Sequence, residues 1–121
     1  MDINEYKVKF YTNPKGKNPV LDYLESISCV ERAKMLRIIE FLREQKGYLD
    51  EPYSKHITGA IREFRIDFGR KRHRIFYFAF VGKTIILLHA FLKNTNETPV
   101  GEIKKAQENY NDVLRNKKIY E

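Results

Sequence analysis

Three alternating runs between residues 61 and 93 constrain the fold of this chain more than any other feature. They span residues 61–68, 72–78 and 85–93 and are rich in branched and aromatic residues, which favour strands. Short glycine-containing segments at residues 69–71 and 81–83 separate them, as tight turns do between neighbouring antiparallel strands. We therefore predict that the three strands form a meander.

The beginning of the chain predicts one more strand and a helix. Tyr6, Val8 and Phe10 alternate with lysines, which is the period of a half-buried strand. Asn18 followed by Pro19 supplies an N-cap and a first-turn proline for a helix that ends near residue 27.

Apolar residues at helical spacing predict two further helices. The first runs from about residue 30 to 46 and carries Ala33, Leu36, Ile39 and Leu42, with Met35 and Ile38 beside them. Pro99 opens the second, which has Ile103, Ala106, Gln107, Tyr110, Val113 and Leu114 on one side. The segment 48–59 has no clear period and contains Pro52 and Gly59, so we predict a loop.

These elements predict an α+β fold. The order is strand, two helices, three strands and a final helix, with no internal repeat. We expect a small, mixed or mostly antiparallel four-stranded sheet. The two N-terminal helices should form a hairpin on one side of it, with the C-terminal helix at its end. At 121 residues the chain is long enough for one domain, which we expect to cover residues 1–121.

A net charge of +7, from 23 Lys and Arg against 16 Asp and Glu, favours a polyanionic partner. Charge does not choose among nucleic acid, an anionic membrane and an acidic protein. No apolar run reaches the roughly 18 residues that span a bilayer, and residues 1–5 lack signal-peptide character, so we expect a cytoplasmic protein. Cys29 is the only cysteine, which excludes an internal disulfide; we expect its thiol to be buried.

Alternation along the strands also predicts which charged residues meet. Glu63 and Arg65 share one face of the first strand, opposite apolar residues that should pack under the helices. If the strands pair in chain order, Arg65, Arg74 and Lys93 converge on one face. Such cations bind phosphate, so an RNA or DNA backbone is the expected ligand.

Aromatic residues share this face. Phe76 lies on the arginine face of its strand, and in the next strand His89, Phe91 and Lys93 lie together, opposite Leu88. Exposed rings here would stack on unpaired bases. The alternative is that Phe76 and Phe91 form a second small core under the last helix.

The charged residues have alternatives of their own. Arg65 and Arg74 could be solvated charges that oppose aggregation, and Glu63 could orient Arg65 rather than act as a general base. Metal-free RNA cleavage, in which the 2′-hydroxyl attacks its own phosphate, fits this set of cations. The sequence shows no obvious strong base for that step.

Further candidates for contact with RNA surround these strands. They are the hairpin tip Arg70-Lys71-Arg72, the adjacent His73, and Lys55 with His56. The histidines are too scattered to form a metal motif, although His89 is the best placed of them for catalysis. No Gly-rich phosphate loop, paired metal carboxylates or nucleophile elbow is present, so we expect neither metal nor cofactor.

The segment from Ile57 to Tyr110 resembles the HigB-like branch of the RelE/ParE toxin superfamily. In that branch a glycine-introduced ELR strand, a YR strand and an LLHGFxKK strand precede Thr-x-x-Thr-Pro and a helix. The corresponding segments here are 59–65, 72–78, 87–93 and 95–99. The chain departs from the pattern at His73 for Tyr, Ala90 for Gly and Asn94 for the second Lys, which leaves the proton-transfer group unassigned.

The resemblance implies a RelE-like fold and a type II toxin that cleaves mRNA during translation on the ribosome. It assigns Arg65 and Arg74 to phosphate binding and transition-state stabilisation, with Lys93 beside them. The implied partner is a HigA-like helix-turn-helix antitoxin, and the pair would bind operator DNA. Two rivals remain, a ParE-like inhibitor of DNA gyrase and a binding component without catalysis.

Overall fold

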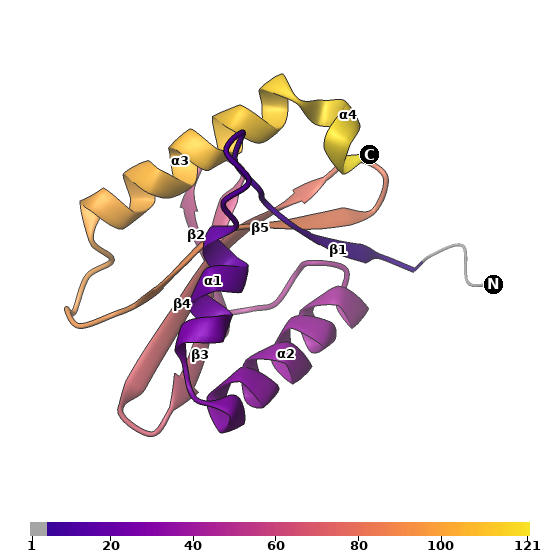
Figure 1. Ribbon diagram of the computed structural model, residues 1–121. Coiled ribbons are helices and arrows are strands. Elements are labelled where there is room, and N and C mark those ends of the chain that lie inside the picture. The colour runs from indigo at the N-terminus through magenta and orange to yellow at the C-terminus, as the bar shows by residue number, and fades with distance from the viewer. Residues whose placement is uncertain (1–4) are drawn as a thin grey trace.

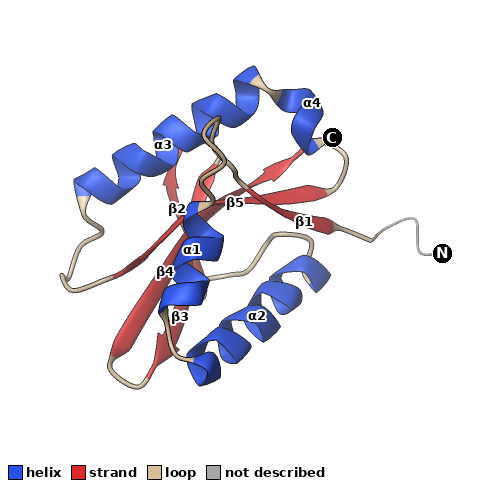
Figure 2. Ribbon diagram, viewed as in Figure 1, coloured by secondary structure: helices blue, strands red, loops and turns tan. Residues whose placement is uncertain are grey.

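A single sheet of five strands lies at the centre of the computed structural model, which describes residues 5–121 (Figures 1 and 2). The strands are β1 (Lys7–Phe10), β2 (Ser54–Thr58), β3 (Ile61–Phe68), β4 (Lys71–Phe80) and β5 (Thr84–Leu92). Their order across the sheet is β1-β5-β4-β3-β2, and only the β1–β5 pair is parallel. The predicted meander of β3, β4 and β5 is confirmed. We expect no signal peptide in residues 1–5. Residues 1–4 of this segment lie outside the described residues.

The predicted count of four strands is wrong, because β2 lies inside the segment that we read as a loop. Its sequence has one aliphatic residue, Ile57, so no apolar alternation marks it. Hydrogen bonds to β3 form this strand instead, and Thr58 is the register partner of Ile61. Gly59, with φ +53°, makes the turn between them; that conformation suits glycine.

Within the described part of the chain, four helices cover the sheet. α1 (Pro19–Ser26) and α2 (Cys29–Glu44) lie on one face, and α3 (Val100–Arg115) with the short α4 (Lys117–Tyr120) lies on the other (Figure 1). The predicted N-cap is confirmed, since the Asn18 side chain accepts the Leu21 N–H at 3.1 Å. No helix within residues 5–121 has both the length and the apolar character needed to cross a bilayer.

The buried stripes of the long helices differ in part from the prediction. In α2, Met35, Ile39 and Leu42 are buried, but Ala33 and Leu36 are exposed because the buried stripe runs from Glu31 through Met35 to Ile39 at four-residue spacing. In α3, Ala106 and Val113 are buried and Ile103 and Tyr110 half-buried, whereas Gln107 and Leu114 are exposed. The expectation of a buried thiol is also wrong. Cys29 is exposed because it is the first residue of α2, on its outer side.

Two apolar cores lie on opposite faces of the sheet. The core under α1 and α2 contains Val20, Leu24, Met35, Ile39, Leu42, Leu49, Phe64, Ile66, Ile75, Tyr77, Ile85, Leu87 and Ala90. The core under α3 and α4 contains Tyr11, Ile61, Phe76, Phe78, Phe80, Ile86, Leu88, Phe91, Ala106, Val113 and Tyr120.

The predicted assignment of β5 side chains to the two faces of the sheet is wrong at Leu88. Leu88 lies in the same core as Phe91, not opposite it. The cause is a β-bulge, since Phe76 pairs with His89 and Tyr77 pairs with Leu87, which leaves Leu88 as the extra residue. A bulge turns two consecutive side chains to one face, and strict alternation cannot anticipate it.

Candidate phosphate-binding site

The cations predicted to meet lie close together at one end of the sheet. Arg65 and Arg74 are register partners across β3 and β4. Arg65 Nε donates to Glu63 Oε1 at 3.4 Å, and Arg74 Nε lies 3.8 Å from the same oxygen. Lys93 follows β5 directly, and its backbone N–H donates to the Arg72 carbonyl at 2.8 Å. Strand alternation therefore predicted their positions correctly, while their chemical roles stay predictions.

Glu63 is the anchor of this cluster. Its side chain is fully buried at 0% exposure, with one oxygen facing the two arginines. The other oxygen, Oε2, accepts the Thr98 hydroxyl at 2.7 Å. A carboxylate with its oxygens occupied in this way orients its cationic neighbours, which fits the ion-pair alternative for Glu63. Sequence reasoning did not single out Thr98, although it is the second threonine of the Thr-x-x-Thr-Pro segment.

Arg74 is held with one donor unused. The residue is 4% exposed; its Nη1 donates to Asp67 Oδ1 at 2.8 Å and to the His73 carbonyl at 2.9 Å. Its Nε is the one buried side-chain nitrogen or oxygen atom in residues 5–121 that lacks a hydrogen-bond partner. Buried polar groups are almost always hydrogen-bonded. The carboxylate oxygen next to this donor is Glu63 Oε1, which at 3.8 Å attracts its charge without accepting a hydrogen bond.

Lys93 is buried among charges of both signs. It is only 7% exposed, and this burial is the main reason that its pKa is lowered. Arg74, Arg65 and Arg72 lower the pKa of Lys93 further by repulsion, while Glu63 opposes them. An ammonium group with a lowered pKa releases its proton more readily than an exposed lysine does.

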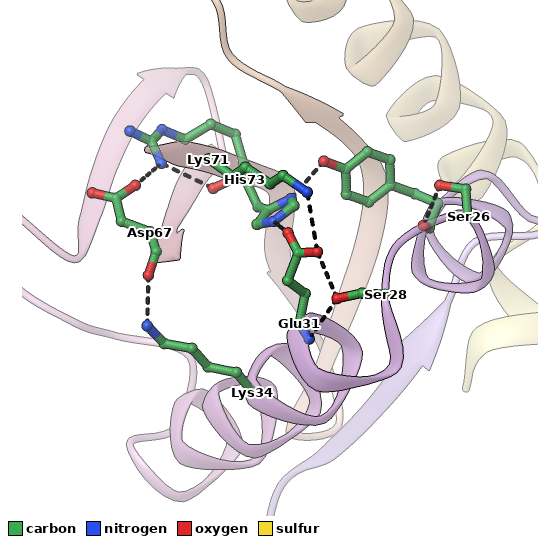
Figure 3. Close-up of polar contacts among 9 residues, drawn as sticks. Ser26, Ser28, Glu31, Lys34, Asp67, Lys71 and His73 are labelled. Carbon is green, nitrogen blue, oxygen red and sulfur yellow. Dashed lines mark hydrogen bonds and ion pairs between the residues drawn. The ribbon is translucent and has the colours of Figure 1, made fainter. Parts of the chain in front are cut away.

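A pocket opens beside the arginines, between α2 and the part of β3 that extends beyond β2. Its volume is about 610 Å³. The lining residues are Lys34, Ile38, Phe41, Leu49, Pro52, Tyr53, Phe64, Arg65, Ile66, Asp67 and Arg74. Figure 3 shows Lys34 reaching from α2 to Asp67, whose backbone oxygen accepts its Nζ at 2.5 Å. The pocket therefore joins an apolar wall to a charged end.

Tyr53 is the pocket residue that sequence reasoning missed most clearly. Its side chain is exposed at 63%, yet its carbonyl accepts the Arg65 N–H at 2.9 Å, which fixes it next to the arginine. The absence of a clear period in residues 48–59 predicts a loop for Tyr53. The available signal was the short spacing to Gly59, which permits a hairpin that returns Tyr53 to the level of Arg65.

His73 lies in a buried hydrogen-bond network and cannot contact RNA in this structure. It is 1% exposed; its Nε2 lies 2.9 Å from Glu31 Oε1 and its Nδ1 lies 2.6 Å from the Tyr23 hydroxyl. Ser28 and Lys71 complete the contacts of the Glu31 carboxylate, at 2.6 and 3.4 Å (Figure 3). The predicted RNA contact of His73 is therefore wrong, because the imidazole instead joins β4 to both N-terminal helices.

The charges of this network follow from its hydrogen bonds. The Ser28 hydroxyl and then His73 lower the pKa of Glu31 to about 2. Burial, and next the negative charge of Glu31, raises the pKa of Tyr23 to about 12. Glu31 is thus a carboxylate that accepts from the Ser28 hydroxyl and from His73 Nε2–H.

Phe76 and Phe91 belong to the second core, so the alternative reading of them is confirmed. They are 0% and 7% exposed, and their ring centroids are 5.3 Å apart. Rings buried against α3 offer no face to a base, so their predicted RNA contacts are wrong.

His89 stands apart from the arginines. Phe76 lies between it and Glu63 in the register of the sheet, and the His89 ring pairs with Glu102 of α3. The structure therefore does not bring His89 into the cluster as a catalytic partner. Within residues 5–121, no group of three or more His, Cys, Asp or Glu side chains is placed to hold a metal ion.

The remaining RNA-binding candidates lie on the surface near the cluster. Arg70 and Lys71 are exposed at the β3–β4 hairpin, and Arg72 is half-buried next to Lys93. Lys55 is exposed on β2 as the register partner of Glu63. His56 beside it is exposed and lies 2.9 Å, through Nε2, from the Gly59 carbonyl. Their contact with RNA stays a prediction.

Comparison with known proteins places the chain in a family. No curated protein matches it. The profile of the family described as Phage derived protein Gp49-like (DUF891) matches residues 22–111, from within α1 to within α3. This match covers more than half of the chain and includes all the residues of the cluster. The chain therefore belongs to the Gp49-like family of phage-derived proteins, which are RelE/ParE-like toxins of toxin–antitoxin systems.

Proposed function

We propose that this protein is a ribosome-dependent mRNA endoribonuclease that arrests translation and growth. The observation that carries the proposal is the convergence of Arg65, Arg74 and Lys93 around the buried Glu63 carboxylate. Three cations against the Glu63 and Asp67 carboxylates leave excess positive charge, and the part-exposed guanidinium of Arg65 can take a phosphate oxygen. Inhibition of gyrase has no need for such converging phosphate ligands.

The proposed reaction is cleavage of RNA by its own 2′-hydroxyl. The 2′-oxygen forms a bond to the adjacent phosphorus, and the bond from phosphorus to the 5′-oxygen breaks. Water takes the 2′ proton, and the products carry a 2′,3′-cyclic phosphate and a 5′-hydroxyl. Arg65 and Arg74 stabilise the negative charge that builds on the phosphate oxygens in the transition state.

Lys93 is our candidate for protonating the leaving 5′-oxygen. Its lowered pKa makes the ammonium a better acid than an ordinary lysine, and it lies among the same charged groups as both arginines. Glu63 positions these cations through ion pairs with the two arginines. We assign it no proton transfer, because its other oxygen accepts the Thr98 hydroxyl.

Membership of the family supports further proposals about the toxin system. The family implies an antitoxin partner. We propose that this partner is a HigA-like helix-turn-helix protein that holds the toxin inactive, and that the pair binds operator DNA. We further propose a HigB-like toxin with a RelE-like fold that acts on ribosomes in the cytoplasm.

Expression in bacterial cells tests the proposal against its rivals. Mapping of mRNA 5′ ends after induction should reveal new 5′ ends inside coding sequences, while plasmid supercoiling stays unchanged. Intact mRNA with relaxed plasmid would favour gyrase inhibition. Intact mRNA with unchanged supercoiling would leave only a binding role.

A further inference from the structure

We infer that α2 positions the Arg74 guanidinium for the proposed reaction by holding the two residues that accept its hydrogen bonds. Arg74 Nη1 donates to Asp67 Oδ1 of β3 at 2.8 Å and to the His73 carbonyl of β4 at 2.9 Å. Lys34 of α2 contacts the first of these residues and Glu31 of α2 the second. The inference rests on the proposed nuclease function. It makes Glu31 and Lys34 positioning residues that act through Arg74.

Lys34 holds the β3 side of the hairpin. It is half-buried on α2, and its Nζ donates to the Asp67 backbone oxygen at 2.5 Å (Figure 3). The same nitrogen lies 5.4 Å from the centroid of the Phe68 ring, within the range of a cation–π contact. Two contacts with consecutive residues therefore hold the strand from which the Asp67 side chain reaches Arg74.

Glu31 holds the β4 side of the hairpin from one turn earlier on α2. Its Oε1 lies 2.9 Å from His73 Nε2, and its Oε2 accepts from Lys71 Nζ at 3.4 Å (Figure 3). The His73 residue is 1% exposed, and the hydroxyl of Tyr23 lies 2.6 Å from the other ring nitrogen. A side chain held at both ring nitrogens also restricts its own backbone, whose carbonyl accepts from Arg74.

The end of the β3–β4 hairpin needs such support because it is only two strands wide. β2 pairs with β3 no further than Phe64, and β5 pairs with β4 no further than His73. In the described part of the chain, Asp67 therefore has a strand neighbour on one side only, in β4. A two-stranded ribbon by itself is marginally stable at best in water. The contacts from α2 take the place of the third strand that this end of the sheet lacks.

Direct binding of RNA by Lys34 is the main alternative, because Lys34 lines the pocket beside Arg65 and Arg74. The contacts favour positioning, since the ammonium group is already engaged with a backbone oxygen and the Phe68 ring. Glu31, a carboxylate that would repel phosphate, makes the matching contact on the other strand. Both contacts end at an acceptor of the same nitrogen of Arg74, which a role in RNA binding does not explain.

The first test observes Arg74 by NMR in the free protein. Its Nε–H is buried, which slows exchange with water, and loss of the signal in Arg74→Lys assigns it. Lys34→Met removes the ammonium group and keeps the length of the side chain, whereas Lys34→Arg restores a donor. Arg37→Met is the matched control, since it removes an exposed cation one turn further along α2. We expect the signal to shift in Lys34→Met and in Glu31→Gln, and to keep its position in Lys34→Arg and Arg37→Met.

The second test measures cleavage in a reconstituted translation reaction. We expect Lys34→Met to lower kcat roughly tenfold or more with KM unchanged, since a misplacement of about 1 Å can cost on the order of 10²-fold in rate. Lys34→Arg should recover most of this loss, and Arg37→Met should cleave as the wild type does. In the Arg74→Lys background, Lys34→Met should cause no further loss, because its effect passes through Arg74. Thermal melting checks the fold, and the Lys34 variants decide if Glu31→Gln does not fold.

Each contrary result has a distinct meaning. A raised KM with unchanged kcat in Lys34→Met would overturn the inference and assign Lys34 to RNA binding. A lower melting temperature with unchanged kcat and an unchanged Arg74 signal would reduce the contact to a structural one. A loss of the same size in the Arg74→Lys background would show that Lys34 does not act through Arg74. No cleavage by the wild type would overturn the proposed nuclease, and the Arg74 signal in the free protein would then decide alone whether α2 positions the guanidinium.

Discussion

Arg65 and Arg74 stand directly opposite each other in neighbouring strands, although their charges repel. Side-by-side cations in a sheet are destabilising unless a counter-charge lies between them. Glu63 provides it, with Oε1 at 3.4 Å from Arg65 Nε and 3.8 Å from Arg74 Nε. The cluster is therefore held in a geometry that suits an anion. The buried Glu63 carboxylate offsets the repulsion between the two arginines.

Removal of this anchor should destabilise the protein strongly. Glu63→Gln leaves buried cations without their partner, for which a loss of about 3–5 kcal/mol in the free energy of unfolding is expected. Asp67→Asn is the matched control, because Asp67 pairs with the same Arg74 but has a side chain that is 60% exposed. It should cost at most about 1 kcal/mol. Urea unfolding of both variants measures the difference, and equal losses would contradict the anchoring role.

The Glu31 network should make stability depend on pH in a defined window. Hydrogen bonds from Ser28 and His73 lower the pKa of Glu31 from 4.5 to about 2 in the folded protein. Below pH 4.5 the unfolded chain binds a proton that the folded chain does not, so stability falls as the pH decreases towards about 2. Glu31→Gln lacks this contribution.

The measurement is the free energy of unfolding from urea titrations at several pH values between 4.5 and 2. The advantage of the wild type over Glu31→Gln should shrink as the pH falls through this window. Glu25→Gln, which changes an exposed carboxylate of α1, should follow the wild type. A constant difference between wild type and Glu31→Gln would contradict the assigned charge state.

Arg74→Lys should abolish growth arrest although it preserves the charge. Lysine lacks the planar fork that donates to Asp67 and to the His73 carbonyl, so it cannot hold the geometry of the cluster. Loss of one such donor costs about 10²–10³ in rate at comparable anion sites. Colony counts after induction measure the effect, and circular dichroism checks the fold. Growth arrest at the wild-type level would mean that Arg74 acts only as a charge.

The sequence predicted the cluster well because its position depends on a regular pattern. Alternation in β3 and β4 places Glu63, Arg65 and Arg74 on one face whatever the rest of the chain does. The glycine-containing turns fixed the order of these strands. Family resemblance then assigned roles in phosphate binding and transition-state stabilisation to Arg65 and Arg74.

The errors arose where tertiary contacts decide the outcome. Phe76 has the same alternation whether its ring meets solvent or α3, so only the position of α3 shows that it is buried. β2 exists because β3 offers it a partner, and its own residues carry little signal. His73 looked like part of a basic hairpin tip, but Glu31 and Tyr23, more than 40 residues away in the chain, hold it in the interior.

The most direct test of the proposed nuclease is mapping of mRNA 5′ ends in a cell-free translation reaction, with and without ribosomes. The proteins are the wild type, Arg65→Ala and, as a matched control, Arg37→Ala, which changes an exposed arginine of α2. Arg65 is 28% exposed in its side chain, so its removal should leave the fold intact. We predict new 5′ ends only when ribosomes are present, with the wild type and Arg37→Ala but not with Arg65→Ala. Intact mRNA in every reaction, or equal cleavage by Arg65→Ala, would contradict the account.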